Sequence, residues 1–342
     1  MIKLYVSLIG LLVVCSIFAN TPVFAGTLLV ANKNGHTVTL FDTKTYKKKA
    51  SLPTGKIPHE VAVSPNGKIA VVTNYGDRNV PGNTLTLVDI RKKSVIKTID
   101  LGKYTMPHGA TWMNDNRSII VTVEGMDGIV IVDVEKAKVE KFIKTDKAVS
   151  HMLAMDSKNE RVYVSSIGGG AVTVIDLLNG KVIKQIEIGR GAEGIDLSTD
   201  DRWLWVSNRS DNKVLIINTK SLEIVKTFPA QEFPIRVSLD SNSKLAFVSN
   251  AYADSISIFD TQSYRLKKTI KLSSNFISRN EKWGRHKESS IPIGIEIDGE
   301  RPVAYVAQTN ADQISVIDLK TLRVIDSFGT EKEPDGMAFS SF

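Results

Sequence analysis

One segment recurs along the chain and restricts the possible folds more than any other feature. Residues 58–74, PHEVAVSPNGKIAVVTN, contain two runs in which apolar residues occupy every second position. A Pro-Asn-Gly turn separates the runs, and this combination predicts a β-hairpin. Variants of the segment begin at residues 106, 150, 192, 233 and 291, so the chain repeats one unit.

Each hairpin is followed by a third strand-like segment that ends in Asp or Asn, and then by a fourth segment. These end residues are Asp42, Asp89, Asp133, Asp176, Asn218, Asp260 and Asp318, which are 47, 44, 43, 42, 42 and 58 residues apart. A period in the low forties with four short strands per repeat is typical of β-propeller blades. We expect each Asp or Asn to bind the amides of the following turn, which is a structural role.

The two ends of the repeat series predict the number of blades. Thr27 opens a strand of the second type directly, whereas the final residues, EPDGMAFSSF, form an inner strand with no partner after it. Pairing the two would complete one more blade and close the ring. We therefore predict an all-β fold, a single seven-bladed β-propeller over residues 26–342 with four-stranded blades.

Several of these repeats resemble those of a known family. Residues 71–74 (VVTN), 162–165 (VYVS), 205–208 (WVSN) and 247–250 (FVSN), with the turn SPNGK at 64–68, resemble the YVTN-type, WD40-like repeats of seven-bladed propellers. The resemblance covers nearly the whole chain after residue 25 and implies the propeller fold. It implies no single activity, because related propellers include exported surface proteins, lactonases, cofactor-bearing oxidoreductase domains and metal-handling proteins.

The N-terminal residues predict export. Lys3 is followed by an uncharged apolar run over residues 4–19, and residues 23–25, VFA, fit a cleavage site before Gly26. The run is short for a membrane span of about 20 residues. We expect a signal peptide over residues 1–25, a periplasmic or secreted protein, and no membrane span after cleavage. The only cysteine, Cys15, lies in this run, so the mature chain would have no disulfide.

The net charge of +7 arises largely from basic runs beside the last strand of several repeats, at residues 44–49, 91–93 and 265–268. Lysine on an exposed edge strand prevents pairing between sheets. A polyanion-binding surface is the alternative interpretation. Because the charge is spread around the rim and not gathered on one stripe, we favour protection of the edge strands over binding of a nucleic acid. Separately, we expect the protein to be a monomer.

Aligning the inner strands places chemically active residues at their first positions, where the central channel opens. This "mouth row" consists of His59, His108, His151, Glu193, Ile235, Ile293 and Asp335. Three of the five histidines stand here in consecutive blades. Channel-facing positions further along are mostly small, and the charged exceptions Arg236, Asp196 and Glu296 each need water, a partner or a ligand.

Two chemical interpretations of the mouth row remain open beside a purely structural one, in which the histidines cap turns. Imidazoles and carboxylates from separate strands suit Zn or Cu, with His59, His108 and His151 as candidate ligands, although no closely spaced ligand motif occurs. Alternatively, His151, Glu193 and Arg236 could bind an anionic substrate and transfer a proton, which is similar in kind to propeller lactonases. No haem-attachment or phosphate-loop motif is present.

Loops on the same face add further candidates. Residues 74–83 bring Tyr75 and Arg78, and the long connection 273–290 brings Trp283, Arg285 and His286; Arg209 and Tyr252 come from two other loops. The long connection could be a lid, a partner contact or a plain surface insertion.

The favoured interpretation is an exported binding protein, more plausible as a non-enzyme, that engages a small molecule or a protein at the mouth face. The alternatives are a protein that binds or delivers a metal and a lactonase-like hydrolase. The sequence identifies no cofactor, and Zn and Cu are the candidate metals.

Overall fold

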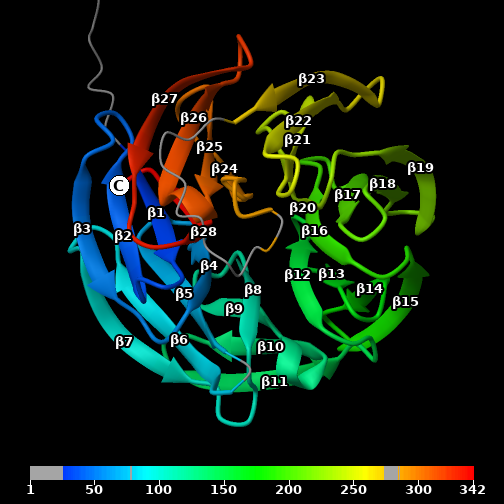
Figure 1. The fold of residues 1–342 in the computed structure, drawn as a ribbon. Coiled ribbons are helices and arrows are strands. Elements are labelled where there is room, and N and C mark those ends of the chain that lie inside the picture. The colour runs from blue at the N-terminus through cyan, green and yellow to red at the C-terminus, as the bar shows by residue number, and fades with distance from the viewer. Residues whose placement is uncertain (1–25, 78, 273–283, 285) are drawn as a thin grey trace, which may run out of the picture.

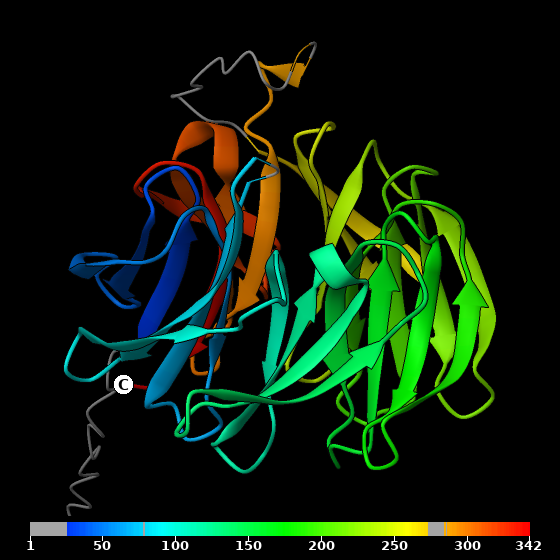
Figure 2. The same cartoon turned by 90° about the horizontal axis from the view of Figure 1, so that it is seen from below.

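The computed structural model describes residues 26–77, 79–272, 284 and 286–342. Within these ranges the chain forms seven four-stranded antiparallel sheets, which follow one another around a ring in chain order (Figure 1). Figure 2 shows the ring from the side, with the strands running between two faces and the C-terminus at one of them. The predicted seven-bladed propeller is confirmed.

The strands of each blade are called inner, second, third and outer by their order from the central channel. The inner strands are β4 (Pro58–Val63), β8 (Pro107–Trp112), β12 (Ser150–Met155), β16 (Ala192–Leu197), β20 (Pro234–Leu239), β24 (Pro292–Ile297) and β28 (Pro334–Ser340). The second strands are β1 (Thr27–Asn32), β5 (Ile69–Gly76), β9 (Ser118–Val123), β13 (Arg161–Ser166), β17 (Trp203–Asn208), β21 (Leu245–Asn250) and β25 (Val303–Gln308). The third strands are β2 (Thr37–Asp42), β6 (Pro81–Asp89), β10 (Gly128–Asp133), β14 (Ala171–Asp176), β18 (Lys213–Asn218), β22 (Ser255–Asp260) and β26 (Gln313–Asp318). The outer strands are β3 (Lys48–Pro53), β7 (Ser94–Asp100), β11 (Lys138–Lys144), β15 (Lys181–Glu187), β19 (Glu223–Pro229), β23 (Arg265–Lys271) and β27 (Arg323–Gly329). The short 3-10 helices η1 (Glu124–Met126) and η3 (Thr309–Ala311) each join a second strand to a third strand.

Apolar side chains of the second and third strands form a series of layers between neighbouring blades. The layer between the β4–β7 and β8–β11 blades, for example, contains Val71, Leu87 and Val121, all nearly inaccessible to solvent. Trp112 of β8 packs in the same layer and donates its indole N–H to the carbonyl of Ala62 in β4 at 2.9 Å. The outer strands are largely exposed, which explains their lysine-rich sequences.

The ring is closed between its first and last strands. β28 pairs antiparallel with β1, with Leu28 opposite Phe339 and Val30 opposite Met337. The C-terminal strand thus supplies the inner strand that the first repeat lacks, as predicted. In the described part of the chain, no helix has the length and apolar character needed to cross a membrane.

The polar residues of the repeats have structural roles. All seven Asp and Asn residues that end the third strands accept hydrogen bonds from backbone amides of the following turn, as expected. The Thr or Ser of the Val-Thr-Asn segment reaches the next blade: the hydroxyl of Thr122 donates to the carbonyl of His151 at 2.6 Å, and that of Ser165 to the carbonyl of Glu193 at 2.5 Å. These bonds hold two residues of the mouth row.

Each inner strand begins with the same local distortion. The residue before the strand has a positive φ, and a β-bulge or shift in register follows within the first positions. The residues with positive φ are Ile57, Met106, Val149, Gly191, Phe233, Ile291 and Glu333. This conformation is unfavourable for the β-branched members of the set, Ile57, Val149 and Ile291. Because a bulge changes the direction of neighbouring side chains, it explains how the mouth row is directed at the channel opening.

Two charged channel residues connect neighbouring blades instead of facing the mouth. Asp196 accepts a hydrogen bond from the amide of Leu239 at 2.8 Å, and Glu296 accepts one from the amide of Phe339 at 2.9 Å. Burial raises the pKa of Asp196 to about 6 and that of Glu296 to about 8, and repulsion from Asp196 contributes to the second shift.

These shifts determine how stability should depend on pH. The folded-state pKa of Glu296 lies above the ordinary value of 4.5, so the folded protein holds an extra proton between the two values. The resulting stabilisation is complete below the lower value and is lost as pH rises through about 8. We expect the thermal midpoint to fall as pH rises across this range, and to fall less in Glu296→Gln. The exposed Glu223→Gln variant should follow the wild type, and identical curves for Glu296→Gln and wild type would contradict this role.

Candidate functional site

All seven residues of the mouth row line one cavity, which has a volume of about 350 Å³. The complete lining is Lys33, His59, His108, His151, Glu193, Arg209, Phe233, Ile235, Arg236, Tyr252, Ile293 and Asp335. The structure therefore brings the seven aligned positions together at one opening of the channel. Asp196 and Glu296, expected in the same region, lie elsewhere in the channel and do not line this mouth cavity.

His151 is held between two carboxylates. Its Nδ1 lies 2.5 Å from Oε1 of Glu124, and its Nε2 lies 3.0 Å from Oε1 of Glu193. Burial alone would lower the pKa of His151, but the two glutamates outweigh burial and raise it to about 9. The imidazole is therefore protonated at neutral pH and donates from both nitrogens.

The two carboxylates have further partners on their outer sides. The hydroxyl of Tyr75 donates to Oε2 of Glu124 at 2.5 Å, and the guanidinium of Arg209 lies 2.8 Å from Oε2 of Glu193. Together with His151, these residues form a continuous polar chain across four blades. Although burial opposes it, the contact with His151 lowers the pKa of Glu124, so the carboxylate stays ionised.

A second charged group lies on the other side of the mouth. Oδ2 of Asp335 lies 3.2 Å from the ammonium of Lys33 and 3.2 Å from Nδ1 of His59. Burial opposes the charge of Asp335, but Lys33 and His59 hold its pKa well below the usual value. Arg236 forms an ion pair with Glu60 at 2.5 Å, with both side chains nearly enclosed.

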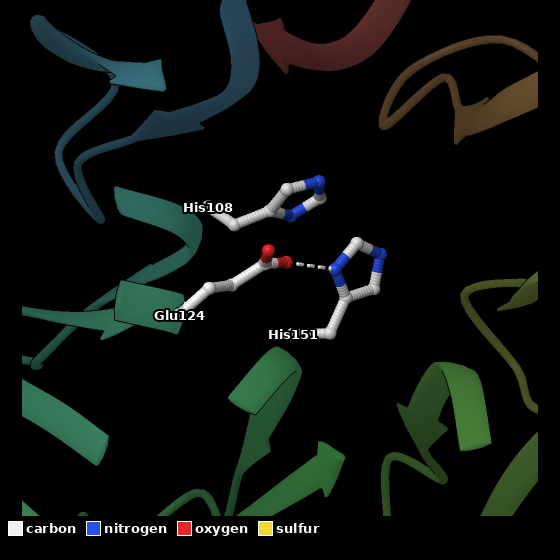
Figure 3. Close-up of side chains that lie close together, drawn as sticks. All are labelled: His108, Glu124 and His151. Carbon is white, nitrogen blue, oxygen red and sulfur yellow. Dashed lines mark hydrogen bonds and ion pairs between the residues drawn. The ribbon is translucent and has the colours of Figure 1, made fainter. Parts of the chain in front are cut away.

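Nδ1 of His108 and Nδ1 of His59 are both buried without a hydrogen-bond partner among the described residues, but that of His59 lies beside the carboxylate of Asp335 at 3.2 Å. The ring of His108 lies between those of His59 and His151, with centroids 4.7 and 3.8 Å away. Burial, and secondarily the charge of His151, lower its pKa well below the usual value, so it is neutral. Its Nδ1 is buried and has no hydrogen-bond partner among the described residues. Figure 3 shows the ring over the carboxylate of Glu124, with one nitrogen on that side.

Aromatic residues from the loops complete one wall of the mouth cavity. Tyr252 stacks on Phe233 at a centroid distance of 4.1 Å and on His286 at 3.8 Å. The guanidinium of Arg209 lies 5.2 Å from the centroid of the Phe233 ring. The expected loop residues Tyr75, Arg209, Tyr252 and His286 thus reach the mouth face. Arg78, Trp283 and Arg285 lie outside the described residues.

Sequence reasoning missed Glu124, Lys33 and Phe233. A signal for the first two existed, because Lys33, Tyr75, Glu124 and Arg209 each directly follow the residue aligned with the Asn of Val-Thr-Asn. An alignment of the residues that directly follow this Asn position in each blade predicts that Lys33 and Glu124 lie at the mouth. Phe233 carried the weaker signal of preceding an inner-strand proline.

Comparison with known proteins gave one family match and two curated relatives. The model of the cytochrome D1 heme domain family matches residues 113–290, more than half of the chain. Antigen Lp49 of Leptospira interrogans is 25% identical over 193 residues, which are 54% of this chain and 41% of that protein. Dihydro-heme d1 dehydrogenase of Pseudomonas aeruginosa is 25% identical over 129 residues, 37% of this chain and 26% of that protein. The matches thus span less than half the length of either relative.

Two solved structures share the architecture. Hydrazine synthase of Kuenenia stuttgartiensis has a TM-score of 0.69 at 18% identity, covering 90% of this chain and 99% of that chain. Dihydro-heme d1 dehydrogenase NirN in complex with DHE has a TM-score of 0.62 at 16% identity, covering 89% of this chain and 63% of that chain. At these identities the likeness shows the fold alone. The comparisons support a β-propeller family, and the YVTN-type assignment stays a prediction.

The ion pair beneath the mouth can be tested through stability. Replacing Arg236 by Met leaves Glu60 buried without its cation, which should lower the free energy of unfolding by about 3–5 kcal/mol. The double variant Glu60→Leu/Arg236→Met removes both charges and should recover most of this loss. Urea unfolding of the single and double variants measures the difference. Equal losses in the single and double variants would contradict the assignment of the loss to an unpaired buried Glu60.

Proposed function

The chain belongs to the cytochrome D1 heme domain family, and from the lining of its mouth cavity we propose that it is a binding protein for a small anionic ligand. The observation that carries this proposal is the excess of cations among the lining residues. Export and a monomeric state stay predictions beside it.

The charges facing the mouth cavity favour an anion. The lining includes Lys33, Arg209, Arg236 and protonated His151, but only two carboxylates, Glu193 and Asp335. The carboxylates that balance the remaining cations, Glu60 and Glu124, are not part of the lining. Because each cation is held by its own ion pair, little reorganisation would be needed when a ligand binds.

The remaining wall and the size of the mouth cavity narrow the ligand class. Phe233, Ile235, Tyr252 and Ile293 contribute apolar and aromatic surface to the lining. A volume of about 350 Å³ lies at the lower end of the range of about 300–1,000 Å³ for small-molecule sites. These features suit a small carboxylate or similar anion with an aromatic or apolar body.

The family name raises the question of an iron tetrapyrrole. His108 supplies a neutral imidazole, as haem ligands do, and the cations could pair with tetrapyrrole carboxylates. However, the described mouth cavity is small for a macrocycle with its side groups. The unpartnered Nδ1 of His108 is buried and lies on the side of Glu124. The described residues therefore do not fit this group.

The geometry favours binding over lactonase-like hydrolysis. A general base must be unprotonated, whereas His151 has a pKa of about 9 and both of its nitrogens contact glutamates. Arg236 is paired with Glu60 and lies in the lining of the same mouth cavity, where it can bind an anion without taking part in proton transfer.

Calorimetric titration with benzoate and with its uncharged isostere benzamide tests the proposal. We expect benzoate to bind and benzamide to bind at least tenfold more weakly. Arg209→Gln should weaken benzoate binding roughly 10- to 100-fold, because a hydrogen bond to a charged group contributes about 1.5–3 kcal/mol.

The matched control is Arg202→Gln, which removes an exposed arginine paired with Asp200 outside the mouth cavity. It should leave benzoate binding unchanged. Equal affinity for benzoate and benzamide, or an unaltered affinity in Arg209→Gln, would refute an anion-binding mouth.

A further inference from the structure

Anion binding leaves one part of the mouth unexplained, namely the buried nitrogen of His108 beside Glu124 and His151. We propose that these three residues form a binding site for one divalent transition-metal ion, Zn²⁺ or Cu²⁺, in the wall of the mouth cavity. The metal site shares His151 with the lining of the mouth cavity, but its evidence and its test do not depend on the anion.

The three side chains already have a suitable separation. One ligand atom from each of His108, Glu124 and His151 lies within 4.8 Å of the other two. Ligands bound to zinc at about 2.0–2.1 Å in tetrahedral geometry lie about 3.3 Å apart. Small side-chain rotations would therefore bring the three atoms around one ion.

The unpartnered nitrogen is independent evidence for a ligand at this place. Nδ1 of His108 is buried, lies on the side of Glu124 and has no hydrogen-bond partner in the described part of the chain. A buried polar atom without a partner is unfavourable and is uncommon in native proteins. Coordination of an ion would satisfy this nitrogen, and one ligand atom of Glu124 and one of His151 lie within 4.8 Å of a ring nitrogen of His108.

The surroundings of the other two ligands match those of known metal centres. If a metal replaced the proton on Nδ1 of His151, Nε2–H would still donate to Glu193 at 3.0 Å. Such carboxylate–histidine–metal arrangements orient the imidazole and increase its basicity. Arg209 holds Glu193 in turn, and Tyr75 binds Oε2 of Glu124 and leaves Oε1 for the ion.

The geometry changes the ligand set that the three histidines of the mouth row suggested. His59 lies beside Asp335, 3.2 Å away, and is not a member of the cluster, whereas Glu124 is. Two imidazoles and one carboxylate suit zinc or copper(II), because calcium and magnesium prefer sites made of oxygen alone. Three protein ligands leave a fourth coordination position open.

The test measures binding of Zn²⁺ and Cu²⁺ to the purified, chelator-treated protein by calorimetry, with metal content by mass spectrometry. We expect one equivalent of metal. His108→Ala and Glu124→Gln should each weaken binding at least 30-fold, and Glu193→Gln should weaken it about 10- to 100-fold through its contact with His151.

His59→Ala is the matched control, since it removes a neighbouring imidazole outside the cluster, and it should bind metal within threefold of wild type. Circular dichroism and thermal midpoints confirm that each variant is folded. Absence of stoichiometric binding by the wild type, or unchanged binding in both His108→Ala and Glu124→Gln, overturns the site. A loss in His59→Ala as large as that in His108→Ala overturns the ligand set. These measurements contain no benzoate, so a negative result contradicts the metal site without contradicting the anion-binding proposal.

Discussion

The pairing of β28 with β1 is the interaction on which the other features of the molecule depend. Each blade of a propeller contacts mainly its two neighbours, so the ring has no other continuous core. The backbone bonds of this pair join the first and last strands of the ring, and no cysteine occurs among the described residues. The same pairing brings Asp335 next to Lys33, because each directly follows one member of the Asn32–Pro334 pair of the two strands. Closure of the ring therefore also places Lys33 and Asp335 at the mouth.

Close packing of the inner strands makes the mouth compact and polar. Glycines at channel positions permit this: a Cβ on Gly294 would lie 2.1 Å from the carbonyl oxygen of Asp335, and one on Gly336 would lie 2.4 Å from that of His59. With the backbones so near, the first side chains of neighbouring blades must contact one another. Buried charges are stable only with partners, and the alternation of acidic and basic residues around the mouth supplies them.

The fold was predictable because each blade carries the same physical signals: alternating apolar residues, a turn, and an Asp or Asn after the third strand. The mouth row was predictable for the same reason, since equivalent positions in a repeat occupy equivalent places. Partners across blades were not, because contacts such as that between Glu124 and His151 depend on the bulge at each inner strand and on the angle between blades. Neither has a sequence signal. The channel residues Asp196 and Glu296 show the same limit, since their bonds to the next strand depend on how closely the blades approach.

The position of the ring closure relative to the mouth cavity has a thermodynamic consequence. Lys33 belongs to the first repeat and Asp335 to the terminal strand, yet both line the cavity that Arg209 reaches from a blade further round the ring. A ligand that contacts these residues joins segments from the beginning, middle and end of the chain. The free energy of ligand binding then adds to the free energy that keeps β1 paired with β28. Occupancy of the mouth and resistance of the closed ring to opening are, in this architecture, linked equilibria.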